Sequence, residues 1–156
     1  GIVQLKHYSK NIQLRKQIAE LYKKGLANIE GISFLPSYPG LSYNYPYLPI
    51  FVDKNKYGIS RDELYDRLKE HNIYGRRYFY PLISHFPPYR GLNSSHPKNL
   101  TTAEQITERV ICMPIYPDLP TDKVKLIISL IRKYKGQEGS FLQKVRISES
   151  SSIKNK

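Results

Sequence analysis

The chain has 156 residues, enough for one domain with a hydrophobic core. Its formal net charge of +12 would ordinarily suggest a nucleic-acid partner, but the basic residues are scattered without a dense cluster, which argues against a dedicated groove. The single cysteine, Cys112, excludes an internal disulfide framework and favours a reducing compartment. No apolar run is long enough to span a bilayer, and the first residues lack a signal-peptide pattern.

Residues 1 to about 27 predict one long helix. Apolar residues recur there at helical spacing, with Arg15 as the single interruption, and lysines occupy the other face. No capping residue precedes Ile2 and no starting methionine is present, so we expect the chain to be cut from a longer protein. The apolar set is Leu5, Tyr8, Ile12, Ala19, Tyr22 and Leu26.

Residues 29–46 read as a loop, because prolines and a glycine punctuate them. Within this loop, residues 32–34 are a candidate for a short strand. Alternating tyrosines then lead into residues 48–52, which are the best candidate for a central strand. The nearby prolines suggest that this strand starts at an edge or a bend.

A helix is expected to begin after Ser60. Ser60 and Glu63 have the spacing of a capping box, in which each side chain satisfies the backbone of the other. Leu64 and Leu68 form the buried stripe, and residues 71–72 close the helix. A strand, a helix and a further strand at this spacing predict a compact α/β unit.

Residues 73–82 are expected to form a strand that runs into a proline turn. Side chains alternate in a strand, which puts Arg77, Phe79 and Pro81 on one face and Arg76, Tyr78 and Tyr80 on the other. Cationic and aromatic groups together suit an anionic ligand that carries flat rings, such as a nucleotide. The alternative is an edge strand with half-buried tyrosines and solvated arginines.

Two further helices and a short strand are expected in the last third of the chain. Thr101 and Glu104 have the spacing of a second capping box, opening a helix that turns Ala103, Ile106 and Val110 inward. Residues 111–114 predict a short buried strand, which makes Cys112 a packed thiol, and residues 116–120 predict a turn.

Thr121 is expected to cap the last helix, which ends at Gly136. The core face of this helix consists of Val124, Ile127, Ile128 and Ile131. Serines and lysines dominate the sequence from residue 137 onward, which predicts a flexible tail.

Four stretches together resemble the C-terminal portion of the DegT/DnrJ/EryC1/StrS family of sugar aminotransferases. They lie in the right order and spacing within residues 1–135. The first is the opening helix, and the second is the helix that begins Ser-Arg-Asp-Glu-Leu at Ser60. The third is Arg-Tyr-Phe-Tyr-Pro-Leu at residues 77–82, and the fourth is Glu-Arg-Val-Ile-Cys-Met-Pro-Ile-Tyr-Pro at residues 108–117.

The resemblance implies an α/β fold class of the α+β kind, the C-terminal domain of a fold type I aminotransferase. A long interdomain helix (1–28) would precede a small sheet flanked by helices (29–136), with a flexible tail (137–156). It implies pyridoxal 5'-phosphate held by a lysine and an aspartate of the larger N-terminal domain. Neither residue has a counterpart here, so we expect no catalytic, cofactor-binding or metal-binding residue in this chain, and no activity from it alone.

The resemblance also implies that the parent protein aminates a nucleotide-linked keto-deoxysugar. The amino donor would be one such as glutamate, and the product would serve deoxyaminosugar, polysaccharide or O-antigen biosynthesis. The parent would be a cytoplasmic homodimer with no nucleic-acid or membrane partner. Arg77, Tyr78 and Tyr80 are the candidate substrate-binding residues, with Arg76 as a weaker one, because a guanidinium pairs with a diphosphate and tyrosine hydroxyls reach sugar oxygens.

One position departs from the family pattern. Many members have a histidine directly after Pro-Leu, whereas here Ile83 stands there and His85 follows two residues later. His85 is therefore read as a surface residue in a turn.

Two other classes of protein stay open, a basic nucleic-acid-binding module and a protein-interaction module without catalysis. Loss of sugar-nucleotide binding after Arg77→Ala, with binding to random DNA unchanged, would separate the first of these from an aminotransferase.

Overall fold

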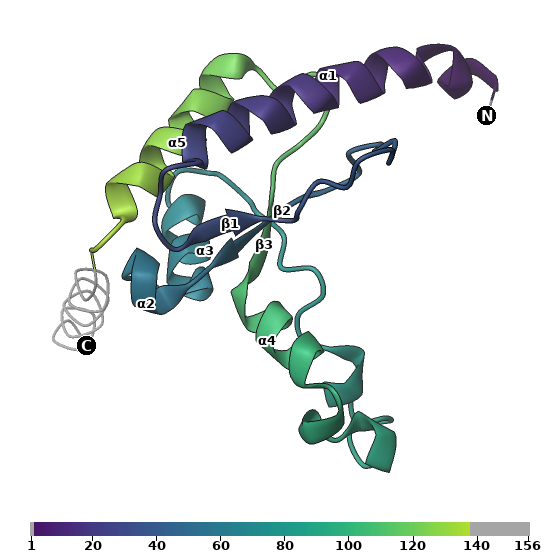
Figure 1. Cartoon of the computed structure of the whole chain (residues 1–156), viewed down its shortest axis with the longest axis vertical. Helices are drawn as coiled ribbons and strands as arrows, with labels where there is room; N and C mark the ends of the chain where they lie inside the picture. The colour runs from purple at the N-terminus through teal and green to yellow at the C-terminus, as the bar shows by residue number, and fades with distance from the viewer. Residues whose placement is uncertain (1, 138–156) are drawn as a thin grey trace, which may run out of the picture.

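The computed structural model describes residues 2–137. Its first element, α1 (Ile2–Leu26), is the long helix that the sequence predicts. Figure 1 shows α1 running across the sheet and beside α5 (Thr121–Tyr134), with its N-terminal end projecting beyond the rest. Ile18 and Tyr22 on its second half are buried, whereas Ile2 and Leu5 on its first half are 78% and 70% exposed. Only the second half of α1 therefore belongs to the core.

The sheet has three antiparallel strands in the order β1 (Ile32–Phe34), β2 (Leu48–Val52) and β3 (Val110–Met113). The predicted central strand is confirmed, because β2 pairs with β1 through Ile32 and Val52 and with β3 through Ile50 and Ile111. Leu48, Ile50 and Val52 are buried, and the residues between them are half-buried, as a strand with one face on the core requires.

Two helices follow β2. The short α2 (Lys54–Tyr57) is capped by the carboxylate of Asp53, which accepts a hydrogen bond from the Asn55 backbone N–H at 3.1 Å. In α3 (Arg61–Lys69) the predicted capping box is confirmed: Ser60 N–H donates to Glu63 Oε2 at 2.8 Å, and Glu63 N–H donates to Ser60 Oγ at 3.2 Å. The Leu64 and Leu68 side chains are fully buried, as expected.

The second predicted capping box is wrong. Helix α4 (Thr101–Arg109) has Thr101 as its first helical residue, so Leu100 stands at the cap position, and its apolar side chain makes no cap. The Glu104 carboxylate lies 2.8 Å from His85 Nε2. Ile106 is 45% exposed, contrary to expectation, and Thr107 is the buried residue of this helix. Three short 3-10 helices, η1 (Ile83–His85), η2 (Asn93–Ser95) and η3 (Pro97–Asn99), precede α4 and project with it away from the sheet (Figure 1).

Helix α5 closes the core. Val124, Ile127 and Ile131 are buried as expected, whereas Ile128 is only half-buried, and Leu130 and Tyr134 are additional core residues. Thr121 is the first helical residue and makes no cap, which corrects its predicted role; Pro120 stands at the cap position.

The end of α5 is fixed at Gly136, in agreement with the prediction. Gly136 has a φ of +74°, and its N–H donates to the Tyr57 carbonyl at 2.8 Å. A Cβ on Gly58 would lie 2.7 Å from the Gly136 Cα, so the two glycines allow the ends of α2 and α5 to approach each other. The predicted tail beyond residue 137 lies outside the described residues. Within the described part of the chain, no helix is both long and apolar enough to cross a membrane.

Candidate functional site

Residues 73–82 do not form the predicted strand. The segment pairs with β3 at one position only, where Arg76 N–H donates to the Cys112 carbonyl at 3.0 Å and Cys112 N–H donates to the Arg76 carbonyl at 2.8 Å. A Cβ on Gly75 would lie 2.8 Å from Ile111 Cδ1, so glycine lets the backbone approach β3 here. Tyr80 N–H then donates to the Arg77 carbonyl at 2.8 Å, which closes a turn where the strand was expected to continue.

Arg77 is engaged within the chain. Its Nη1 contacts Asp62 Oδ1 at 2.7 Å, and Arg61 Nε contacts the same oxygen at 2.8 Å. The Arg77 guanidinium also lies 4.5 Å from the ring centre of Tyr65 and 5.1 Å from that of Tyr80. The hydrogen bond to Asp62 is the main reason that the pKa of Arg77 is raised. We call Arg61, Asp62, Tyr65, Arg77 and Tyr80 the Asp62 cluster; it ties the segment to the first two turns of α3.

Arg61 is the buried member of the Asp62 cluster. Its side chain is 1% exposed, and its Nη1 donates to the Val110 carbonyl at 2.9 Å. Burial lowers its pKa, and the negative charge of Asp62 opposes this shift. The guanidinium lies 4.9 Å from the ring centre of Tyr80, so Tyr80 contacts two arginines. These contacts place Tyr80 with Arg77, although the expected alternation put the two on opposite faces.

Arg76 belongs to a different group. It is exposed, its Nη1 donates to the Tyr78 hydroxyl, and its guanidinium lies 5.6 Å from the centre of the Tyr78 ring. Tyr78 in turn meets Tyr47 edge to face, with ring centres 5.0 Å apart. Arg76 has no carboxylate partner among residues 2–137. We call Arg76, Tyr78 and Tyr47 the Arg76 edge. It presents an oriented cation beside aromatic rings.

The Arg76 edge borders a hollow of about 310 Å³ beside β3. Tyr47 and Arg76 line it together with Tyr74 and Tyr116. The sequence signal for Tyr74 was its place in the same aromatic stretch, whereas Tyr116 and Tyr47 come from other segments and had no such signal. The structure therefore adds three tyrosines to the candidate site.

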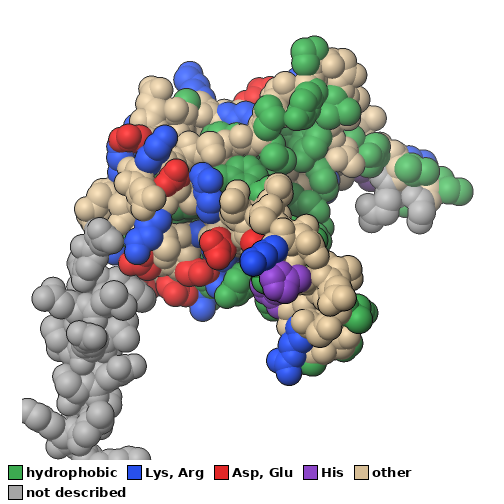
Figure 2. All heavy atoms as spheres, turned by 60° about the horizontal axis from the view of Figure 1, so that its bottom comes forward, with side chains coloured by type: hydrophobic (Ala, Val, Ile, Leu, Met, Phe, Trp, Pro, Cys, Tyr) green, Lys and Arg blue, Asp and Glu red, His purple; other side chains and the backbone are tan. Residues whose placement is uncertain are grey.

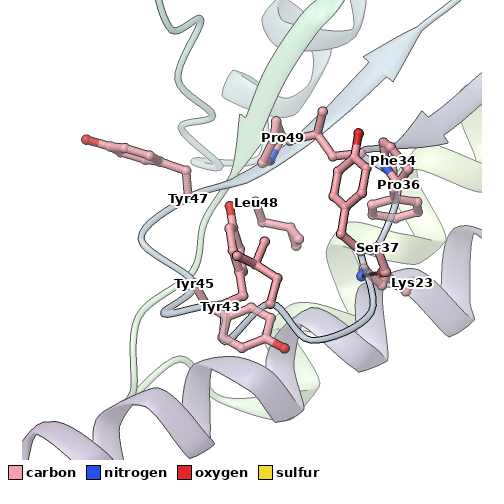
Figure 3. A pocket seen from close by; sticks show the side chains of 12 residues that line it. Lys23, Phe34, Pro36, Ser37, Tyr43, Tyr45, Tyr47, Leu48 and Pro49 are labelled. Atoms are coloured by element: carbon pink, nitrogen blue, oxygen red, sulfur yellow. Dashed lines mark hydrogen bonds between the residues drawn. The ribbon is translucent and has the colours of Figure 1, made fainter.

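A second hollow, of about 270 Å³, lies between α1 and the loop that joins β1 to β2. Figure 3 shows that side chains from α1, the loop and both strands surround it, and that Tyr47 points away from the others. Lys23 is its single charged residue among the described ones, and the Lys23 Nζ donates to Ser37 Oγ at 3.4 Å. An apolar hollow of this kind suits an apolar group better than a phosphate.

Large hydrophobic side chains are also exposed at the surface, including several that line the second hollow. Figure 2 shows them gathered in one broad area of the visible face, with most charged side chains outside that area. Exposed examples on the loop between β1 and β2 are Leu35, Tyr38, Leu41 and Tyr43. Exposed apolar patches are typical of surfaces that contact another molecule.

The remaining candidate side chains have structural partners. Cys112 is buried, as expected for a packed thiol, and burial raises the pKa of that thiol, which disfavours the reactive thiolate. His85 lies at the surface and pairs with Glu104, and His71 Nε2 lies 2.8 Å from the Tyr134 hydroxyl. Among the described residues, no cluster of histidine, cysteine, aspartate and glutamate could hold a metal ion.

Comparison with known proteins gives a consistent result. Residues 1–132 match the DegT/DnrJ/EryC1/StrS aminotransferase family. The chain is 44% identical over 131 residues to the dTDP-4-amino-4,6-dideoxy-D-glucose transaminase of Escherichia coli, covering 84% of this chain and 35% of that protein. It is 29% identical over 134 residues to the GDP-perosamine synthase of Vibrio cholerae, covering 86% of this chain and 35% of that protein. The chain thus spans about a third of the length of these relatives.

Solved structures agree with the expected fold class. The aminotransferase TlmJ from Streptoalloteichus hindustanus superposes with a TM-score of 0.73 at 25% identity, covering 86% of this chain and 34% of that one. DesI, solved in the presence of its TDP-sugar product, superposes with a TM-score of 0.78 at 22% identity, covering 94% of this chain and 36% of that one. The helices and small antiparallel sheet described above are those of a fold type I sugar aminotransferase.

Proposed function

Because the chain belongs to the DegT/DnrJ/EryC1/StrS aminotransferase family, we propose that it is the C-terminal part of an enzyme that transfers an amino group to a nucleotide-linked keto-deoxysugar. Support comes from the 44% identity to a dTDP-sugar transaminase. The substrate, a donor such as glutamate, a cytoplasmic location and a homodimeric state are parts of this proposal. We keep residues 1–28 as the connecting helix and 29–136 as the small domain.

Among residues 2–137, no lysine is sheltered as the cofactor lysine of such an enzyme would be. A lysine that forms an imine with the cofactor needs a sheltered site that lowers its pKa. No lysine among residues 2–137 is buried, and the buried charged residues there are Arg61 and Arg67. The proposal therefore assigns the cofactor to the rest of the parent protein, and to this chain a role in binding substrate.

The Arg76 edge is the part of this chain that we assign to the substrate. The observation that carries the assignment is an exposed guanidinium, oriented by the Tyr78 hydroxyl, with no carboxylate partner in the described residues. Such a group pairs readily with a phosphate, because little existing interaction has to be broken. Arg77 is the weaker candidate, since binding a phosphate would compete with its 2.7 Å contact to Asp62.

The test uses the full-length protein with Arg76→Ala. We expect KM for the nucleotide sugar to rise about 10- to 100-fold, the effect of one lost charged hydrogen bond, with kcat changed less than about threefold. The matched control is Arg90→Ala, because Arg90 is also exposed and its side chain has no partner among the described residues. An unchanged KM in Arg76→Ala, with normal folding, would contradict the assignment.

A further inference from the structure

The chain lies outside the core from Arg76 onward. Every residue from 76 to 100 is half-buried or exposed, and the first buried residue of the helix that follows is Thr107 on α4. Apolar packing therefore contributes little to the position of the turn at 77–82, which carries Tyr78. Polar contacts have to hold this turn in place.

The turn is held from two sides. On the side of the sheet, the backbone of Arg76 pairs with β3 and the Arg77 side chain pairs with α3. On the other side, the Thr107 hydroxyl donates to the Phe79 carbonyl at 2.8 Å. This last bond fixes the backbone of the residue that directly follows Tyr78.

The hydroxyl of Thr107 is more than a means of filling space. Thr107 is 3% exposed, and a buried hydroxyl is stable only when it has a hydrogen-bond partner. Valine has almost the same shape and would pack at this position without needing one. The Phe79 side chain is 68% exposed, so its carbonyl, and not its ring, anchors the turn to α4.

The anchored carbonyl lies next to the group that orients Arg76. The Tyr78 hydroxyl accepts a hydrogen bond from Arg76, and the Tyr78 ring lies 5.6 Å from the Arg76 guanidinium. Tyr78 and Phe79 share one peptide unit, which is rigid. A shift of the Phe79 backbone would therefore also move the Tyr78 ring, and Arg76 would lose its orientation.

We propose that Thr107 is a positioning residue of the substrate site. By holding the Phe79 carbonyl it keeps the Tyr78 ring and hydroxyl against Arg76. This rests on the proposed function, which assigns Arg76 to the substrate, and it adds a residue on α4 that acts through Arg76. The alternative is a purely structural role, in which the bond supports the fold and leaves Arg76 unaffected.

The experiment measures KM and kcat of the full-length protein for its nucleotide sugar. Thr107→Val removes the hydroxyl and keeps the shape, and we expect it to raise KM about three- to tenfold, the effect of one hydrogen bond, with kcat changed less than about twofold. Thr107→Ser keeps the hydroxyl and should have the KM of the wild type.

The matched control is Ser129→Ala on α5. The Ser129 hydroxyl also donates to a backbone carbonyl, that of Leu126, at 2.7 Å, but both residues are exposed and belong to another element. Its loss should leave KM unchanged.

A double variant separates positioning from a structural role. If Thr107 acts through Arg76, Thr107→Val should raise KM no further when Arg76→Ala is already present. A structural role predicts the same factor in both backgrounds. Thr107→Ala serves in the same comparison if Thr107→Val does not fold. Failure of both variants to fold would show that the bond belongs to the fold, and would overturn the inference.

Other outcomes would also overturn the inference. They are an unchanged KM in folded Thr107→Val, an equal rise of KM in Thr107→Val and Thr107→Ser, and an effect of Thr107→Val that multiplies with that of Arg76→Ala. If Arg76→Ala by itself still raises KM, the proposed function stands in each of these cases. If Arg76→Ala leaves KM unchanged, the assignment of Arg76 to the substrate fails, and the inference fails with it.

Discussion

Arg76 and Arg77 are neighbours in sequence, yet their surroundings differ completely. Arg77 shares the Asp62 carboxylate with buried Arg61 and lies against two tyrosine rings. Arg76 faces solvent, and a tyrosine hydroxyl is its one side-chain hydrogen-bond partner among the described residues. The same side chain therefore holds the fold together at one position and is available to a ligand at the next. The charges in the sequence do not distinguish these two roles. The Asp62 carboxylate on α3 does, because it pairs with Arg77.

The largest expected effect of breaking the Asp62 cluster comes from Arg61→Ala. This change removes a buried guanidinium, its hydrogen bond to the Val110 carbonyl and its ion pair with Asp62. We expect the free energy of unfolding to fall by about 3 kcal/mol, because a buried polar network loses its central member. Urea denaturation of the 156-residue chain measures it. A loss below about 1 kcal/mol would mean that the network contributes little to the fold.

A smaller loss is expected for Asp62→Ala. It leaves Arg61 and Arg77 without their carboxylate, but the Asp62 side chain is 49% exposed, so water replaces part of the interaction. We expect the free energy of unfolding to fall by about 2 kcal/mol in the same denaturation measurement. Asp66→Ala, on the same helix and with no side-chain partner among the described residues, is the control and should cost less than about 0.5 kcal/mol. Equal losses of unfolding free energy in both variants would contradict a stabilising role of the Asp62 cluster.

The two arginines themselves give the sharpest contrast. Arg77→Ala should cost about 1 kcal/mol of unfolding free energy, and Arg76→Ala less than about 0.5 kcal/mol. A double-mutant cycle between Arg77 and Asp62 should give a coupling energy of about 1 kcal/mol, whereas the cycle between Arg76 and Asp62 should give none. A measurable coupling of Arg76 to Asp62 would remove the distinction between the two regions.

The smallest expected effect is on the pH dependence of stability, and it comes from Glu63, which lies next to the Asp62 cluster in α3. Burial acts to raise the pKa of Glu63, but the hydrogen bonds from Ser60 outweigh it, so the pKa is lowered from its usual 4.5. A lowered pKa means that the ionised form is stabilised on folding, so this stability is present above pH 4.5 and is lost as pH falls. Wild type should be more stable than Glu63→Gln at pH 7, and the difference should shrink below pH 4. A difference that grows on acidification would contradict this.

Local signals predicted much of the fold. The capping box at Ser60 needs only two residues three apart, and the apolar pattern of β2 needs only its own five residues. The box at Thr101 failed because the helix already includes Thr101, which leaves Leu100 at the cap position, and Glu104 pairs with His85, 19 residues away. The strand at 73–82 failed because Tyr80 N–H bonds back to the Arg77 carbonyl, and alternation alone does not reveal a turn.

The candidate site was harder to predict than the fold. The sequence identified the stretch around Arg76 and Arg77, but their ranking depended on Asp62, 15 residues from Arg77 in the chain. Tyr47 and Tyr116 join Arg76 because β2 and β3 bring their flanking segments together. Contacts between distant segments have no local signal, so the sequence alone favoured the arginine that the structure pairs internally.

The most direct measurement is a crystal structure of the full-length protein with its nucleotide sugar bound. We expect a phosphate oxygen within about 3 Å of an Arg76 guanidinium nitrogen. The contact between Arg77 and Asp62 should remain as it is in this chain, at 2.7 Å. A diphosphate bound to Arg77, with the contact to Asp62 broken and Arg76 in solvent, would contradict the division between the two arginines.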